Sequence, residues 1–159
     1  MLEFRREVHA VKNLFESDTV DEVLSRIDRL QPASPRQWGK MDSAQMLAHC
    51  SAAMAMATGE SDLPRLFIGR FIGSLVKPVF LNEKPFSKNN PTAKELVFSD
   101  PCDFSREREG LRSRIRSFHD GGEAKCTRHP HPFFGSLTPQ EWSRGMYKHL
   151  DHHLRQFGV

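Results

Sequence analysis

Residues 147–157 read YKHLDHHLRQF, and this stretch near the end of the chain sets the expectations for both the fold and the site. Three of the chain's eight histidines fall within five positions here. No helix breaker interrupts the stretch and Gly158 follows as a C-terminal stop, so we expect a helix. Side chains four positions apart share one helix face, so His149 and His153 can direct two imidazoles at one cation.

The face on which each histidine lies follows from a rotation of about 100° per helical residue. The apolar residues form one broad stripe, which consists of Trp142, Met146, Tyr147, Leu150, Leu154 and Phe157. His153 falls inside this stripe and His149 falls at its edge. His152 falls towards a charged face that includes Asp151, so we expect it on the surface. The alternative is that all three are surface and boundary histidines of an ordinary amphipathic helix.

A second expected helix supplies a candidate for a third ligand. Residues 43–58 read SAQMLAHCSAAMAMAT, which carries no formal charge and is rich in Ala and Met. This composition predicts a buried central helix, and Asp42 with Gln45 predicts a capping box at its start. His49 is then either a hydrogen-bonded core residue or a ligand. Together with the inward histidines of the last helix it would form a three-histidine metal site with open positions.

Two further helices are expected from apolar residues at spacings of three and four. One covers about residues 19–30, and the other covers about residues 105–119 and stops at Gly121-Gly122. Residues 1–16 carry the spacing of a short lead-in helix. We therefore predict an all-α fold, in which residues 1–159 form a single four-helix-bundle domain with a long crossover between its second and third helices.

The crossover contains a short extra helix and a loop. Residues 63–81 read LPRLFIGRFIGSLVKPVFL and predict an amphipathic helix that packs over the bundle or lies at a dimer interface. A membrane-surface helix is the alternative. Gly69 and Gly73 have a spacing that permits close contact between helices. Residues 83–93 are rich in Pro and Asn and predict a loop, and long loops often cover a site.

The composition limits the partners and the compartment. The net charge of +3 is too small to indicate nucleic acid, and no apolar stretch reaches the length of about 18 residues that a membrane span needs. Met1–Asn13 is charged and lacks the apolar core of a secretory signal. Cys50, Cys102 and Cys126 are odd in number and lack C-x-x-C spacing. They predict free thiols in the cytoplasm and argue against a disulfide framework or a cysteine-rich zinc site.

The motifs on these helices resemble those of the DinB (DinB/YfiT-like) superfamily. They are residues 46–49, which end in His49, and residues 149–156, which place Arg-Gln after the second inward histidine. The flanking residues 38–41 and 131–139 resemble a branch of that superfamily known mainly as a domain of unknown function. The resemblance extends from about Phe15 to the end of the sequence.

The resemblance implies an up-up-down-down bundle that binds a divalent metal through His49, His149 and His153. Zinc or nickel is the first expectation, and iron and manganese also occur in such relatives. Many relatives form dimers, and characterised members include metal-dependent transferases of low-molecular-weight thiols and a thiol-dependent isomerase. Those relatives often read His-Arg-Gly-Gln after the last ligand, whereas this chain reads His153-Leu-Arg-Gln156. The metal pattern is therefore intact, but the thiol-transferase motif is not.

Three residues are candidates for contacts with the ligands or with a substrate, namely Gln45, His131 and Gln156. An imidazole ligand usually needs a hydrogen-bond partner for its second nitrogen, and Gln45 lies one turn before His49 on the same face. No catalytic residue is assigned.

Three functions stay open on the sequence alone. The first is a metal-dependent enzyme, transferase or hydrolase-like, that acts on a low-molecular-weight thiol or small electrophile. Metal-bound water or thiol has a lowered pKa, and a bound metal can also polarise a carbonyl group. The second is a non-catalytic metal-binding or stress-associated interaction module. The third is a structural bundle whose histidines bind nothing. We expect a homodimer with a small-molecule substrate and with neither a nucleic-acid nor a membrane partner.

Overall fold

The computed structural model describes residues 12–159, and over this range the chain is all-helical. The expected lead-in helix lies mostly outside the described residues. No residue in the range belongs to a strand, and the backbone of His131 pairs with that of Gly135 in an isolated bridge. The elements are the helices α1 (Ser17–Arg29), α2 (Ser43–Ala57), α3 (Phe67–Leu81), α4 (Phe104–Lys125) and α5 (Pro139–Gln156), with a 3₁₀ turn η1 (Lys94–Leu96).

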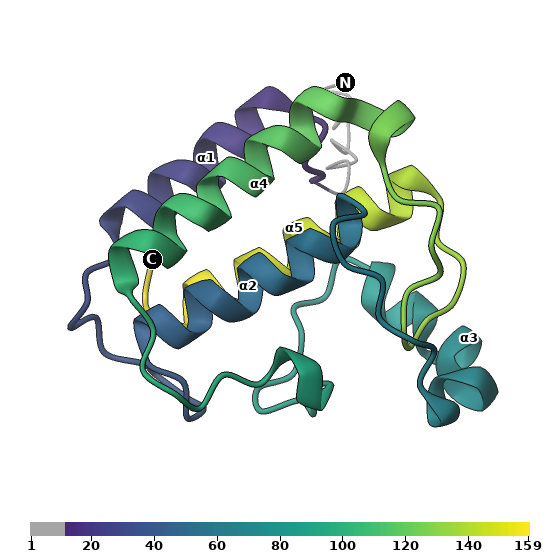
Figure 1. Cartoon of the computed structure of the whole chain (residues 1–159), viewed down its shortest axis with the longest axis horizontal. Coiled ribbons are helices and arrows are strands. Elements are labelled where there is room, and N and C mark those ends of the chain that lie inside the picture. The colour runs from purple at the N-terminus through teal and green to yellow at the C-terminus, as the bar shows by residue number, and fades with distance from the viewer. Residues whose placement is uncertain (1–11) are drawn as a thin grey trace, which may run out of the picture.

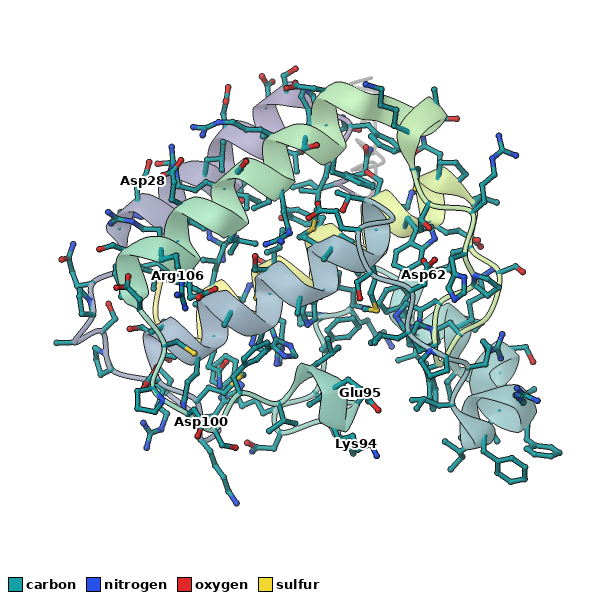
Figure 2. The ribbon with its side chains drawn as sticks, viewed as in Figure 1. Asp28, Asp62, Lys94, Glu95, Asp100 and Arg106 are labelled. Atoms are coloured by element: carbon teal, nitrogen blue, oxygen red, sulfur yellow. The ribbon has the colours of Figure 1, made fainter. Side chains whose placement is uncertain are left out.

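Helix α2 lies at the centre of the arrangement. It packs against α4 and α5 and also touches η1, whereas α1 packs against α4 and α5. Figure 1 shows α1 and α4 side by side, with α2 and α5 beneath them. Helix α3 stands away from α1, α2 and α4 and packs against α5. The long connection between α2 and α4 contains both α3 and η1. Figure 2 labels Lys94 and Glu95 on η1, which lies across from α2.

The composition of α2 explains its central place. Almost every side chain of this helix is buried, because Ala, Met and Leu surround its whole circumference. The side chain of Asp42 accepts a hydrogen bond from the Gln45 amide, and the Gln45 side chain accepts one from the Asp42 amide. The predicted capping box is therefore confirmed, and a second one at Thr138 and Glu141 begins α5.

The end of α4 lies beyond the predicted stop. Asp103 caps the helix as expected, since its carboxylate accepts a hydrogen bond from the Arg106 amide. Gly122 leaves helical geometry with φ +56°, but the chain resumes a helical path as far as Lys125. The glycine pair therefore kinks the helix rather than ending it, because the residues after Gly122 can still form helical hydrogen bonds.

Helix α3 is held against the loop of residues 131–135. Gly69 and Gly73 are buried against the backbone of Phe133, so their close contact is with a loop and not with another helix. On α3, several large apolar side chains point away from this contact and are exposed. No helix within residues 12–159 combines the length and the apolar character that a membrane span requires.

One ion pair binds α1 to α5 across the interior. Arg26 donates to a carboxylate oxygen of Asp151 at 2.8 Å, and both side chains are largely buried. The prediction that Asp151 lies on a charged outer face is therefore wrong. Helix α1 covers that side of α5, and it brings an arginine that compensates the burial of the carboxylate.

Candidate metal centre

Two helices bring three histidines to one point. His49 comes from α2, and His149 and His153 come from α5. Each offers one ring nitrogen, and these three nitrogens lie within 4.8 Å of one another. The expected meeting of the three histidines is thus found, although His49 lies a hundred residues before His149 in the sequence.

His49 is fixed by the segment that crosses over α2. The side chain is 2 % exposed, and its Nδ1 lies 2.8 Å from the carbonyl oxygen of Leu96 in η1. A carbonyl oxygen only accepts, so Nδ1 carries the proton and Nε2 presents its lone pair. His49 therefore has the tautomer that a metal ligand bound through Nε2 requires.

His153 is fixed in the same way from the other side. Its Nδ1 lies 2.8 Å from the side-chain oxygen of Gln156, whose nitrogen donates to the carbonyl oxygen of Trp38. This second bond sets the orientation of the amide, so Gln156 must present oxygen to His153. The chain Trp38–Gln156–His153 leaves Nε2 of His153 as the free acceptor. Gln156 thus occupies the supporting position that the sequence suggested.

His149 completes the cluster with an unusual contact. Its Nε2 lies 2.9 Å from Nε2 of His49, and its Nδ1 is buried without a hydrogen-bond partner among the described residues. If the proton of His149 is on Nδ1, the lone pair of its Nε2 faces the lone pair of His49 Nε2. If the proton is on Nε2, the buried Nδ1 is an acceptor without a donor. A cation between the two Nε2 atoms would remove the first conflict.

The separation of these two nitrogens is compatible with shared coordination. A metal about 2.0–2.1 Å from each nitrogen places neighbouring nitrogens about 2.9 Å apart in an octahedral site and about 3.4 Å apart in a tetrahedral one. The observed 2.9 Å falls at the octahedral end of this range. The cluster can therefore hold a metal ion through three imidazoles, with further positions left for other ligands.

All three imidazoles are kept neutral by their surroundings. Burial lowers the pKa of His49 and that of His153, the latter to about 3. Burial lowers the pKa of His149 well below 6.5, with a further contribution from the neighbouring histidines. Neutral imidazole is the form that binds metals, so the ligands are ready at neutral pH without losing a proton.

The other two predicted supporting residues are engaged elsewhere. The Gln45 side chain accepts from the Asp42 amide and donates to the Ser99 carbonyl, so the partner of His49 is the Leu96 carbonyl instead. The Nδ1 atom of His131 accepts from the amides of Phe133 and Phe134. His131 therefore holds the loop on which α3 rests.

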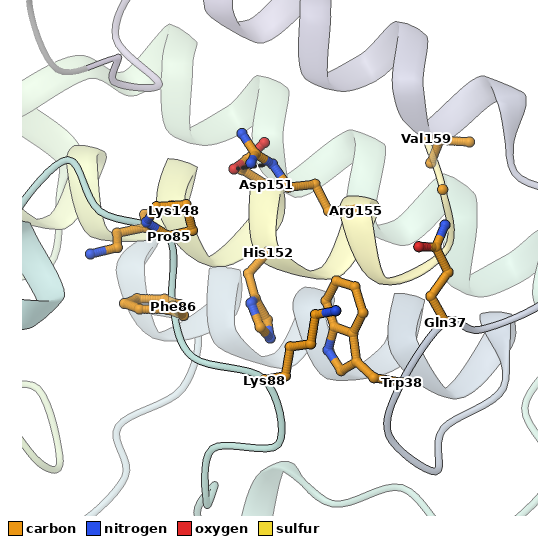
Figure 3. Close-up of a pocket in the computed structure, with 11 residues that line it drawn as sticks. Gln37, Trp38, Pro85, Phe86, Lys88, Lys148, Asp151, His152, Arg155 and Val159 are labelled. Carbon is orange, nitrogen blue, oxygen red and sulfur yellow. Dashed lines mark ion pairs between the residues drawn. The ribbon is translucent and has the colours of Figure 1, made fainter.

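His152 differs from its predicted surface position. Its ring lies 5.5 Å from that of Trp38 and 5.9 Å from that of Phe86, and it is partly buried. The reason is that the loop of residues 83–93 folds over this side of α5. In Figure 3, His152 extends from α5 between Phe86 and Trp38, with Lys88 beside the indole.

These residues line a pocket of about 490 Å³ beside the cluster. The ring of His152 lies 5.0 Å from that of His153, so one ring separates the pocket from a candidate ligand. Asp151, the one acidic side chain among the lining residues, is paired with both Arg26 and Arg155. Figure 3 shows Arg155 turned towards Asp151. The Lys88 ammonium lies 4.7 Å from the centre of the Trp38 ring, so the pocket offers a ligand a cation and an aromatic face.

Sequence reasoning missed two backbone groups of the site. The carbonyl of Leu96 orients His49, and the carbonyl of Trp38 orients Gln156. A carbonyl has no signature in the residue code, because every residue carries one. The position of Trp38 just before α2 was the one sequence feature that indicated its nearness to the site, and no sequence feature indicated a role for Leu96.

Residues 12–159 are all-helical, and α2 and α5 direct three histidines to one point, so the chain is of the class of helical proteins with a candidate metal centre. The chain belongs to the family described as protein of unknown function (DUF1569), which it matches over residues 11–158. This agrees with the expected membership of a family of unknown function. No curated protein and no solved structure matches the chain.

Proposed function

We propose that His49, His149 and His153 bind one divalent metal ion. The observation that carries this proposal is the convergence of three neutral imidazoles, two of which have their Nδ1 protons taken by fixed acceptors. The Nε2 atoms of His49 and His149 also approach to 2.9 Å, a separation that one shared metal ion would give. Borderline metals suit three imidazoles, so zinc and nickel are proposed first, with iron and manganese as further candidates.

We also propose that the fold is the DinB-like four-helix bundle. The support is that α1 and α2 each pack against both α4 and α5, while the connection from α2 to α4 carries α3 and η1 as extra elements. The short η1 turn then has a function, because its carbonyl orients a candidate ligand from outside the four helices.

The activity proposed for this site is that of a metal-dependent enzyme, in particular a transferase that acts on a low-molecular-weight thiol or small electrophile. Three protein ligands leave coordination positions open, which is typical of catalytic rather than structural zinc sites. A metal held there would lower the pKa of a bound thiol or water. The pocket beside His152 is of a size that suits a small substrate. The three free cysteines support a reducing compartment, and we propose the cytoplasm.

One observation favours the alternative of a non-catalytic metal-binding or stress-associated module. None of the three candidate ligands is among the residues that line the pocket. A substrate in the pocket would therefore need His152 to move before it reached the metal. A screen of metal-loaded protein against thiols with small electrophiles separates the two functions. Turnover that His152→Ala changes supports the enzyme, and the absence of any turnover supports the module.

The metal itself is tested by elemental analysis of purified protein after supplementation with zinc, nickel and manganese. We expect about one ion per wild-type chain, and a loss of at least tenfold in His49→Ala, His149→Ala or His153→Ala. His129→Ala is the matched control, because His129 is exposed and lies outside the cluster. A wild-type chain without metal after supplementation overturns both the enzyme and the module.

A further inference from the structure

The side of α3 that faces away from the rest of the molecule is apolar along its whole length. This outer face of α3 consists of Phe67, Ile68, Phe71, Ile72, Leu75 and Val79. Phe67 is 77 % exposed and Leu75 is 76 % exposed. Within residues 12–159 the remaining large exposed hydrophobic side chain is Val97, so the exposure is concentrated in one element.

We propose that the outer face of α3 is the surface through which two copies of this chain associate. The six side chains expose roughly 700 Å², taking about 200 Å² for a whole Phe side chain and somewhat less for an aliphatic one. This exceeds the largest apolar patch of a typical monomer, which is about 300–600 Å². The surface is therefore one that a partner covers.

The area fits a second copy. Complete coverage of both faces would bury at most about 1,400 Å² in total, and this upper limit lies within the range of about 1,200–2,000 Å² for stable interfaces. A two-fold axis places the same patch on both sides, so one self-complementary apolar helix face suffices. Phe71 and Leu75 lie near the middle of the face and would lie closest to the axis.

The charges around the face argue for a protein partner and against a lipid surface. Lys77 forms an ion pair with Glu141, and Arg65 donates to the carbonyl oxygen of Gly69. Of the basic residues on this segment, Arg70 is the exposed one. Binding to anionic membranes usually relies on several neighbouring lysines or arginines, which this rim lacks.

The inner side of α3 fixes the orientation of the outer face. Because Gly69 and Gly73 lie directly on the Phe133 backbone, α3 cannot rotate to hide its apolar residues against the rest of the chain. Figure 1 shows the helix standing away from α1, α2 and α4, so another molecule can approach it. The association needs no metal, so its test is independent of the proposed metal site.

The test is the mass of the full-length protein in solution by light scattering, at micromolar concentrations. We expect about 36 kDa, twice the 18.2 kDa of one chain. The double variant Phe71→Glu/Leu75→Glu should be monomeric, with a dissociation constant raised by about 100-fold or more. Both side chains are exposed in the monomer, so the variant should keep its helical circular dichroism and its metal content.

Val97→Glu is the matched control, because Val97 is exposed and apolar but lies outside α3. It should remain dimeric. A monomeric wild-type protein, or a dimer that survives the double substitution, overturns the proposal. So does a wild-type monomer that floats with vesicles of phosphatidylcholine and phosphatidylserine, which would assign the face to a membrane.

Discussion

At the scale of single residues, the hydrogen bond made by Nδ1 of each histidine determines how firmly the ring is oriented for metal binding through Nε2. His49 and His153 each have a fixed acceptor for Nδ1, whereas Nδ1 of His149 has none among the described residues. Partners of this kind orient the ring and raise its basicity, and their loss typically lowers metal affinity by about 10–100-fold. Gln156 is the one side chain that has this role here.

Replacing Gln156 with Ala should therefore weaken metal binding by about 10–100-fold without removing a ligand. Gln156→Glu keeps an oxygen acceptor for His153 but loses the donor to the Trp38 carbonyl, so it should restore only part of the affinity. The measurement is a competition titration against a chromophoric chelator.

Gln140→Ala is the control on the same helix, since the Gln140 side chain bonds only to Glu123 among the described residues. Equal affinities for Gln156→Ala and the wild type would show that this hydrogen bond does not support a ligand.

His131 gives the protein a predictable response to acid. Burial and the charge of Arg65 lower its pKa from 6.5 to about 4. Between these pH values the unfolded chain binds a proton that the folded protein does not, so the free energy of unfolding falls as the pH falls. One such proton contributes a slope of about 1.4 kcal/mol per pH unit.

His131→Asn should flatten that slope by about this amount between pH 6 and about 4.5, because Asn does not titrate. Its side-chain oxygen can still accept from the amides that Nδ1 holds. Urea unfolding of metal-free protein at several pH values measures the slope. The exposed His129, replaced by Asn, serves as the control, and an unchanged slope in His131→Asn would contradict the assignment.

At the scale of the elements, two helical glycines should respond to alanine with opposite signs. A Cβ on Gly73 of α3 would overlap the carbonyl oxygen of Phe133. On Gly110 of α4 it would meet no atom closer than 3.8 Å. Gly110→Ala should raise the free energy of unfolding by about 0.5–1 kcal/mol, because alanine loses less backbone entropy in a helix.

Gly73→Ala should instead lower stability by about 1–3 kcal/mol and loosen α3 from its loop. Urea unfolding followed by circular dichroism gives both values, and trypsin cleavage after Arg70, the one arginine of α3, reports the loosening. A stabilising Gly73→Ala would mean that α3 does not rest on Phe133.

The helix ends show where the sequence pattern was sufficient to predict the structure and where it was not. The capping boxes at Asp42 and Thr138 were predicted because their hydrogen bonds join residues three positions apart. The end of α4 was misplaced, because a glycine pair permits either a stop or a kink and local sequence does not choose between them.

At the scale of the whole molecule, the candidate site joins parts that are distant in sequence. It links α2 to α5 directly, and it reaches η1 through Leu96 and the segment before α2 through Trp38. A ligand that binds only the folded state stabilises all of these parts together. At a metal concentration of 100 times the dissociation constant, the gain is about 2.7 kcal/mol.

The melting temperature of the metal-loaded protein should therefore rise by roughly 5–10 °C over that of the metal-free protein. His49→Ala should abolish this rise, whereas His129→Ala should keep it. Differential scanning calorimetry with and without a chelator measures the shift. An equal rise in His49→Ala would place the bound metal elsewhere.

The sequence by itself determined the helical character of the chain, the buried nature of α2 and the inward direction of His149 and His153. Each of these features depends on the periodicity of a single helix, and this periodicity can be read from residues three and four positions apart. The tertiary structure alone decided that Leu96 orients His49 and that Trp38 orients Gln156. It also decided that Asp151 is buried against Arg26 and that His152 lines a pocket. These contacts join segments far apart in the chain, and such contacts are fixed only when the helices and loops pack together.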